Sequence, residues 1–377
     1  MTSFDVLVIG GGIAGLSAAA ALSTHARVVV LEAEAAPGYH SSGRSATFYH
    51  LGIGDRTVRA LTTFSRPFFE QTSHQGAPLS TPKAALWIAR SDMIEGLNKL
   101  YDGMRMFSDQ VHHVGVPEML DLLPVLRTGP EAIIAGVVDE TGRKLDADAL
   151  QQGFARTLRR NGGQIETGVR VDSITREHGA WLLQSGDKAW RAGVVVNAAG
   201  AWADQVARLA GVKPLGLSPL RRTIIAFDPP EHIETRDWPF VKTTVDEFYM
   251  LPEGGRLLAS PVDEIPSDPV DAQPEDYDIA LAAYRVEEYT TMNVSRIAHR
   301  WAGLRSFVKD RVPTAGFAPD APGFFWLAGQ GGYGLQTSPA MAAASAALIL
   351  QQEWPPVLAE LGVAPEHVSP GRPAIAS

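Results

Sequence analysis

Three glycines near the start of the chain stand at the spacing of a phosphate-binding turn. Gly10, Gly12 and Gly15 follow a short apolar run and precede an alanine-rich segment, and Glu32 ends the next apolar run. In such a turn the first glycine permits the bend, the second lets the backbone approach a pyrophosphate, and the third lets helix and strand pack closely. Glu32 would accept hydrogen bonds from ribose hydroxyls. The pattern predicts a dinucleotide site, and a glycine turn in an unrelated α/β protein is the weaker alternative.

Two further groups of residues could do chemistry. Arg221 and Arg222 lie together on a predicted strand, where alternation sends them to opposite faces, so at most one points at a given site. Arginine binds carboxylates through two parallel hydrogen bonds. Near the other end of the chain, Gly331–Gly334 precede an alanine-rich helix that we expect to start near Thr337. Glycines there would let the backbone approach a flat ring, although a simple packing helix is the alternative.

The elements that must position these residues alternate between strands and helices. Strands are predicted over residues 4–9, 26–31, 164–166, 169–174, 181–184, 194–200 and 324–328, and helices over 16–22, 146–160 and from 337 to about 352. Residues 223–227, 248–251 and 257–260 alternate like an antiparallel sheet, with a hairpin turn at 253–255. The fold class is therefore α/β, with a discontinuous Rossmann-like domain interrupted by an α+β substrate domain built on an antiparallel sheet.

The domain boundaries follow from these changes of pattern. We assign residues 1–54, 145–215 and 300–365 to the nucleotide-binding domain, 55–144 and 216–299 to the substrate domain, and 366–377 to a flexible tail.

Composition excludes several classes of function. The net charge of −9 without a basic block argues against nucleic acid or an anionic membrane as the main partner. The chain has no cysteine, which excludes disulfides, thiolate metal sites, iron–sulfur clusters and a flavin tethered through sulfur. No metal site and no stable membrane insertion are predicted. We expect the protein to be located in the cytoplasm. If it passes electrons to a quinone, we expect it to be attached to the surface of the inner membrane.

Several segments resemble one superfamily of flavoproteins. These are residues 38–45, 196–200, 214–217, 248–249, 301–306 and 331–334. Together they resemble the D-amino acid oxidase/dehydrogenase superfamily, and within it most closely the bacterial FAD-dependent D-arginine dehydrogenases. The resemblance runs over nearly the whole chain. It implies that the Rossmann-like domain is an FAD-binding domain and that FAD is held non-covalently.

The resemblance also implies which residues contact FAD. Beside Gly10, Gly12, Ile13, Ala14, Gly15, Glu32 and Ala33 of the first turn, it indicates Ser41, Ser42, Gly43, Arg44, Ser45, Ala46, Val171, Ala199, Gly200, Trp202, Gly303, Arg305, Gly331, Gly332, Tyr333, Gly334, Leu335, Gln336 and Thr337. Gln336 and Thr337 are expected to donate hydrogen bonds to the flavin from the positive end of their helix. For Arg44 the alternative is an ordinary surface arginine.

For catalysis the resemblance selects Arg222 and Arg305 as a clamp on the substrate carboxylate. Tyr249 would hydrogen-bond that carboxylate or cover the pocket, and the carbonyl of Gly332 would accept from the substrate ammonium. The reaction implied is oxidation of a D-amino acid to an imino acid by hydride transfer from Cα to flavin N5, followed by hydrolysis to a 2-oxo acid and ammonia. Structural ion pairs for the arginines and a core position for Tyr249 are the alternatives.

The sequence departs from the D-arginine dehydrogenases where they bind the cationic side chain. Phe48 and Ile53 replace a histidine and a tyrosine, and residues 84–87 offer no acid. A buried guanidinium without a carboxylate partner is costly. We therefore hypothesise a neutral or apolar side-chain pocket walled by Phe48, Ile53 and Trp87, with plain core packing as the alternative.

Three matters stay open on the sequence alone. The same fold could oxidise a secondary amine, a cyclic imino acid or a 2-hydroxy acid. The chain could instead be a flavin subunit of a hetero-oligomeric dehydrogenase. The electron acceptor could be a quinone or O2, because no motif encodes access to the flavin.

Overall fold

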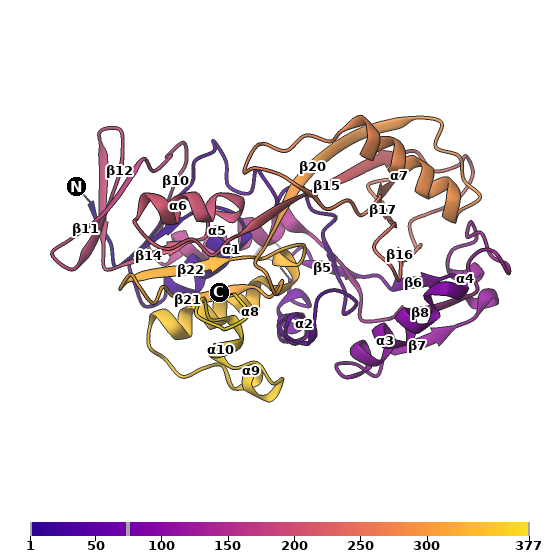
Figure 1. Ribbon diagram of the computed structural model, residues 1–377, viewed down its shortest axis with the longest axis horizontal. Helices are drawn as coiled ribbons and strands as arrows, with labels where there is room; N and C mark the ends of the chain where they lie inside the picture. The colour runs from indigo at the N-terminus through magenta and orange to yellow at the C-terminus, as the bar shows by residue number, and fades with distance from the viewer. Residues whose placement is uncertain (1, 73–75, 376–377) are drawn as a thin grey trace.

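The chain folds around two large sheets that lie side by side in the computed structural model (Figure 1). The structure describes residues 2–72 and 76–375, so the predicted tail is seen without its last two residues. No helix among these residues is long and apolar enough to cross a lipid bilayer.

The first large sheet has six strands, and its strand order corresponds to the dinucleotide-binding pattern predicted above. Five strands are parallel and β21 is antiparallel. In spatial order the strands are β10 (Gln164–Glu166), β3 (Val28–Leu31), β2 (Val6–Ile9), β14 (Val194–Asn197), β22 (Phe324–Ala328) and β21 (Thr314–Phe317). β2 and β3 are buried along their whole length, as expected of parallel strands covered on both faces.

Alternate residues of these strands enter two different cores. Val6, Val8 and Val28 pack on one face with the helices α1 (Ile13–Leu22) and α8 (Gly334–Ile349). Leu7 and Val29 pack on the other face with α6 (Ala203–Leu209) and a small sheet. That sheet consists of β1 (Thr2–Ser3), β13 (Lys188–Ala192), β12 (Ala180–Ser185) and β11 (Ser173–Glu177).

The second large sheet has nine strands and is mostly antiparallel. In spatial order it contains β19 (Ile265–Pro266), β15 (Ser218–Phe227), β18 (Arg256–Ser260), β17 (Tyr249–Glu253), β16 (Phe240–Thr243), β6 (Ala85–Ala89), β8 (Ala135–Asp139) and β7 (Val111–Val114), with β20 (Ile297–Phe307) paired to β15. The long strands β15 and β20 run from this sheet toward the six-stranded sheet (Figure 1).

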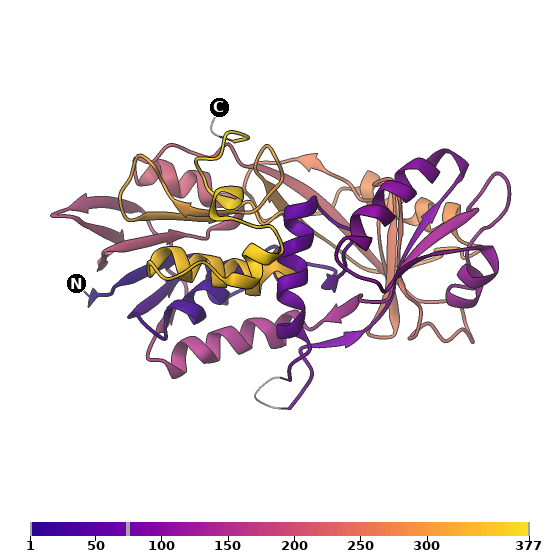
Figure 2. The same cartoon turned by 90° about the horizontal axis from the view of Figure 1, so that it is seen from below.

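Smaller elements complete the fold. Helix α2 (Arg56–Phe69) stands between the two halves in Figure 2 and packs on α8. A three-stranded sheet is formed by β4 (Phe48–Tyr49), β9 (Arg143–Leu145) and β5 (Ser80–Pro82). The remaining helices are η1 (Ser91–Met93), α3 (Ile94–Arg105), α4 (Val116–Leu122), α5 (Ala147–Arg160), η2 (Gly200–Trp202), α7 (Asp276–Tyr289), α9 (Pro356–Glu360) and α10 (Pro365–Val368).

Three local expectations need correction. The strand predicted over 169–174 begins only at Ser173, because the chain leaves the large sheet after β10 and enters the small one. The last long helix begins at Gly334 rather than near Thr337. The predicted flexible tail is packed from 366 to 375: α10 is helical, and the buried Arg372 donates to both carboxylate oxygens of Asp310. The proposed domain division stays a prediction, although its boundary at 299/300 falls inside β20.

Candidate active site

Three adjoining cavities follow the ends of the parallel strands. The nucleotide cavity lies between Gly10, Glu32, Val171 and Trp202. The central cavity shares Gly12, Ser41 and Ser42 with it and continues past the glycines of residues 329–334. The arginine cavity shares Arg222, Arg305 and Gly332 with the central cavity and ends among Phe48, His50 and Tyr249. Together the three cavities form one continuous path from the first glycine turn to the antiparallel sheet.

The first glycine turn has the geometry that its spacing predicts. Gly10 has a φ of +106°, and a Cβ there would lie 2.5 Å from the carbonyl oxygen of Ala198. A Cβ on Gly15 would overlap the carbonyl oxygen of Gly10, so helix α1 can approach strand β2 only because residue 15 is glycine. Gly12 precedes α1 and has no side chain that could cap the helix; Ser42 of a neighbouring loop accepts from the N–H of Ile13 instead. The N–H groups that follow Ile13 in the first turn of α1 remain as a site for an anion.

Glu32 lies at the rim of the nucleotide cavity and is held there by backbone. Its carboxylate accepts from the N–H of Gly11 at 2.6 Å and from the N–H of Glu34 at 2.8 Å. Each oxygen keeps a second lone pair, so the group can still accept from a ligand hydroxyl.

The 38–46 loop crosses the mouth of the central cavity. Ser42 Oγ accepts from the N–H of Ile13 at 2.9 Å, and Ser41 Oγ donates to the carbonyl of Leu304 at 2.6 Å. The Arg44 guanidinium donates to Asp271 and to the carbonyls of Ala272 and Ala302. Arg44 thus ties the loop to β20, and these donors are used within the protein even though the residue lines the cavity.

The opposite wall of the central cavity is built from glycine. Gly303, Gly329, Gly331, Gly332 and Gly334 all line it. Helix α8 starts at this wall, and no side chain caps its first turn. The positive end of α8 therefore faces the cavity, where it would stabilise negative charge.

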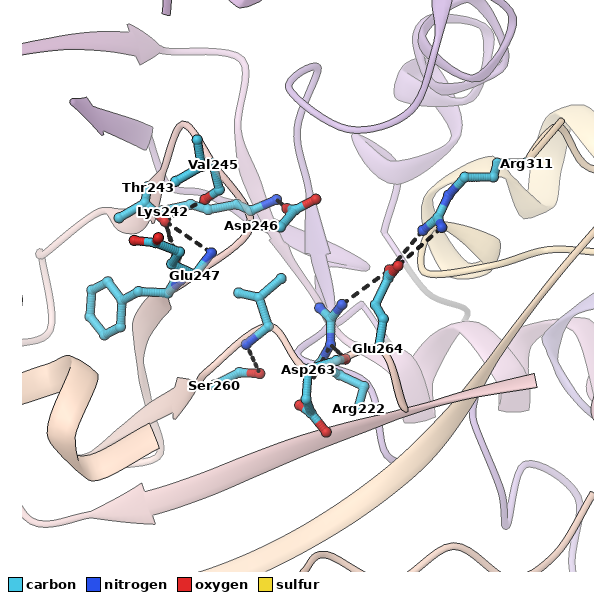
Figure 3. Close-up of polar contacts among 12 residues, drawn as sticks. Arg222, Lys242, Thr243, Val245, Asp246, Glu247, Ser260, Asp263, Glu264 and Arg311 are labelled. Atoms are coloured by element: carbon cyan, nitrogen blue, oxygen red, sulfur yellow. Dashed lines mark hydrogen bonds and ion pairs between the residues drawn. The ribbon is translucent and has the colours of Figure 1, made fainter. Parts of the chain in front are cut away.

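Arg222 is the most deeply buried cation of the arginine cavity. Its Nε donates to the carbonyl of Asp263 at 2.7 Å, and Nη2 lies 3.3 Å from Glu264, which also pairs with Arg311 (Figure 3). Burial, reinforced by the charge of Arg305, lowers the pKa of Arg222 to about 10. Its neighbour Arg221 turns to the other face of β15 and pairs with Glu275 and Asp278. The alternation expected of a strand thus leaves one of the two arginines at the cavity.

Arg305 lies on β20 opposite Leu220 and reaches the same space. Among the described residues no hydrogen bond or ion pair to its guanidinium is formed, and a Cβ on Gly332 would lie 2.8 Å from its Nη1. A glycine at position 332 is therefore what leaves room for this guanidinium.

Two polar atoms buried beside the arginines lack partners among the described residues. They are the hydroxyl of Tyr249 and Nδ1 of His50. Burial, together with the charges of Lys242, Arg305 and Arg59, lowers the pKa of His50 to about 3, so the ring is neutral at pH 7. Buried polar atoms normally have partners, so both atoms are candidates to bind a ligand.

The comparisons with known proteins agree with this geometry. The family model described as FAD dependent oxidoreductase matches residues 5–348, which is most of the chain. The chain belongs to the family of FAD-dependent oxidoreductases.

Individual relatives of this oxidoreductase are distant. It is 24% identical to the uncharacterized oxidoreductase YurR of Bacillus subtilis, over 92% of this chain and 95% of the relative. It is 23% identical to the mitochondrial dimethylglycine dehydrogenase of Rattus norvegicus, over 68% of this chain but only 30% of that longer protein. The FAD-bound L-alpha-glycerophosphate oxidase of Mycoplasma pneumoniae has a TM-score of 0.82 at 20% identity, covering 94% of this chain and 98% of the other. The resemblance to D-arginine dehydrogenases is thus supported as far as the family.

The cavities of this oxidoreductase fit FAD. The glycine walls admit a flat ring, and the N-termini of α1 and α8 meet the path where a diphosphate and a reduced ring would carry negative charge. Most predicted FAD residues line the nucleotide or central cavity: Gly10, Gly12, Ile13, Ala14, Glu32, Ala33, Ser41, Ser42, Arg44, Ser45, Ala46, Val171, Ala199, Gly200, Trp202, Gly303, Arg305, Gly331, Gly332, Gly334 and Leu335.

Five predicted FAD residues lie elsewhere. Gly15 and Gly43 face backbone atoms of Gly10 and Gly38 instead of a cavity. Tyr333 packs on Phe307 and donates its hydroxyl to the carbonyl of Arg311. The N–H and hydroxyl of Thr337 both donate to the carbonyl of Tyr333, because α8 begins one turn earlier than predicted. Gln336 lines the arginine cavity, where its amide is bound to Thr62 and the backbone of His50.

The predicted substrate walls are only partly in place. Phe48 and Ile53 line the arginine cavity, whereas Trp87 does not. The Trp87 ring lies against Gly52, whose missing side chain makes the room, and its edge faces His50. Trp87 therefore supports the wall from behind.

Sequence reasoning missed four residues of this cavity: Thr47, His50, Phe240 and Lys242. Phe240 stacks on Phe48 and on His50, with ring centroids 4.7 Å and 5.2 Å apart. Phe240 and Lys242 are two residues apart on one short strand, so their side chains point to the same face of the sheet. A lysine on the same face as a large aromatic residue was the signal in the sequence that could have indicated Lys242.

Proposed function

We propose that this oxidoreductase oxidises a small amino acid, of the D configuration, to its imino acid, which water then converts to a 2-oxo acid and ammonia. The observation that supports the proposal is the position of Arg222 and Arg305. Both line the arginine cavity and the central cavity, so a carboxylate held between them would place its α-carbon beside the FAD site. The D configuration rests on the family resemblance of the sequence.

FAD, when bound, supplies the acceptor for the two electrons that leave the Cα–H bond. The protein residues bind and orient the substrate. Arg222 and Arg305 would take the carboxylate, and the unpartnered hydroxyl of Tyr249 would donate a third hydrogen bond to it. His50 is neutral and its Nδ1 has no partner among the described residues, so the ring would hydrogen-bond the substrate amine in its neutral form. Its pKa of about 3 makes it too weak a base to take the proton of the ammonium, so the amine would enter the site already neutral.

A secondary or tertiary amine is the second candidate substrate. The similarity to dimethylglycine dehydrogenase favours it, and the arginine clamp would serve an N-alkyl amino acid equally well. A 2-hydroxy acid has the same carboxylate, and the substrate panel below includes this class because a neutral His50 could hydrogen-bond its hydroxyl as well.

The test is anaerobic reduction of the purified, FAD-loaded protein. A panel of D-amino acids, L-amino acids, N-methylglycine and 2-hydroxy acids is added, and the loss of oxidised flavin absorbance is followed. We expect D-amino acids to reduce the flavin fastest. Reduction by N-methylglycine or 2-hydroxy acids with no reaction of any primary amino acid would overturn the proposal.

A further inference from the structure

The arginine cavity holds one cation more than a single carboxylate needs. Arg222, Arg305 and Lys242 line it, and no carboxylate among the described residues does. The two arginines also line the central cavity, whereas Lys242 lines only the arginine cavity. Lys242 therefore lies outside the part of the cavity that is shared with the FAD site, in the part where the rest of the substrate would lie.

The sheet fixes Lys242 in this place. On the antiparallel pair β16–β17, Lys242 is directly opposite Tyr249, so the two side chains share a face of the sheet. Phe240, two residues earlier, points to the same face and lines the same cavity. The lysine is thus part of the wall that carries the substrate-facing Tyr249.

The charge of Lys242 is only partly neutralised by the protein. Its Nζ lies 2.5 Å from Asp246, four residues along the chain, and Figure 3 shows the side chain reaching toward that turn. The Lys242 side chain is 15% exposed but that of Asp246 is 66% exposed, so water weakens this ion pair. Burial and the charges of Arg222 and Arg305 lower the pKa of Lys242, while Asp246 opposes that shift. A second anion in the cavity would relieve this repulsion among the cations.

We propose that Lys242 binds a second anionic group of the substrate, so that the substrate class is an amine with two carboxylates, such as an acidic amino acid or an imino-diacid. The inference rests on the proposed function, since it assigns the first carboxylate to Arg222 and Arg305. It replaces the hypothesis of a neutral or apolar side chain. Phe48, Ile53 and Phe240 then enclose the short carbon chain between the two carboxylates.

A purely structural ion pair between Lys242 and Asp246 is the competing explanation. Removing such a pair would lower stability and slow every substrate to the same degree. A substrate contact would instead change the ratio between an acidic substrate and its uncharged analogue of equal size. Selectivity is therefore the decisive readout.

The experiment compares matched pairs on the FAD-loaded protein under anaerobic conditions: glutamate with glutamine and aspartate with asparagine in both configurations, and iminodiacetate with N-methylglycine. We expect the acid of a pair to exceed its neutral analogue in kcat/KM by about 10-fold to 100-fold, the range of a charge-assisted hydrogen bond. In Lys242→Met this ratio should fall to about one, because kcat/KM for the acid falls while kcat/KM for the neutral analogue stays the same. Lys242→Arg keeps the positive charge and should retain most of the preference.

Lys99→Met is the matched control. Lys99 forms the same kind of ion pair four residues apart, with Glu95, on an exposed face of α3. Its loss should leave the ratio unchanged. If Lys242→Met is poorly folded, Asp246→Asn tests the same idea, because freeing Lys242 should raise the preference for the acid.

Equilibrium binding separates the two proposals. By calorimetry, succinate should bind the wild type more tightly than butyrate does, and Lys242→Met should remove the difference. Equal binding of both compounds, or reduction by neutral amino acids as fast as by acidic ones, would overturn the role of Lys242 and leave the proposed function standing. Tight succinate binding with no reduction by any amine would overturn the proposed function instead.

Discussion

At the scale of the residue, the adjacent Arg221 and Arg222 have different partners because successive side chains of a strand point to opposite faces of the sheet. Arg222 enters the arginine cavity, and Arg221 pairs with two acids of the α7 region. Arg222→Lys keeps the charge but loses the planar fork that fits a carboxylate, so we expect kcat/KM for the amino acid substrate to fall about 10-fold to 100-fold, mainly through KM. Arg221→Lys should change it by less than about 2-fold. An equal loss in both variants, measured by anaerobic flavin reduction, would indicate a general effect on β15.

His50 makes a prediction about acid stability. Its pKa falls from an ordinary 6.5 to about 3 on folding, because burial and nearby cations oppose its charge. Below pH 6.5 the unfolded chain therefore binds a proton that the folded chain does not, and stability falls as the pH falls toward 3. The loss attributable to His50 should be about 2 kcal/mol between pH 7 and pH 5. Urea unfolding of wild type and His50→Phe at both pH values measures it, and equal pH dependence of the two proteins would refute this assignment.

At the scale of the element, the site depends on two helices whose N-cap residues, Gly12 and Tyr333, form no side-chain cap. Helices α1 and α8 both start at a cavity wall, and glycines in or beside their first turns allow the close approach. An ordinary capping side chain would stabilise each helix but would occupy the space of the anion. The sequence analysis predicted both helices from the glycines but started each of them about one turn late, at 16 instead of Ile13 and near 337 instead of Gly334, because Gly15 and Gly334 are themselves helical.

Gly15→Ala tests this arrangement. The new Cβ would overlap the carbonyl oxygen of Gly10 and push α1 away from β2, so we expect a loss of about 1–3 kcal/mol of stability and of FAD during gel filtration. Gly153→Ala is the control, because Gly153 is a helical glycine of α5 whose Cβ would meet nothing within 4 Å. It should gain about 0.5–1 kcal/mol and keep its FAD. Retention of FAD by Gly15→Ala with an unchanged melting temperature would contradict this account.

At the scale of the whole molecule, the features that could be predicted from the sequence are those that depend on the spacing of neighbouring residues. The first glycine turn, Glu32 and the divergence of Arg221 from Arg222 each depend on a few consecutive residues. His50 could not be found in that way, since it joins Phe240 and Lys242 of β16 only when the 47–50 segment packs against that strand. Trp87 was misplaced for the same reason: Gly52, far away in sequence, decides where its ring packs.

The C-terminal segment shows the same dependence on distant partners. Its composition resembles a tail, yet Arg372 is 7% exposed and bridges to a turn about sixty residues earlier. Its guanidinium donates to both oxygens of Asp310, to Thr314 Oγ1 and to the carbonyl of Val312. This contact closes the end of the chain over β21, the edge strand of the six-stranded sheet, and edge strands left open invite wrong pairing.

Arg372→Ala should therefore destabilise the whole fold. Asp310 is only partly buried, with 21% of its side chain exposed, so the loss of its buried partner should cost about 1.5–3 kcal/mol, the range of a hydrogen bond to a charged group. Arg27→Ala removes an ion pair with Asp5 in which both side chains are more than half exposed, and it should change the stability far less than Arg372→Ala does. Urea unfolding of the FAD-loaded variants measures both. If the two variants lost equal stability, the contact of Arg372 with Asp310 would not stabilise the fold, and β21 would be stable at the edge of the sheet without the C-terminal segment.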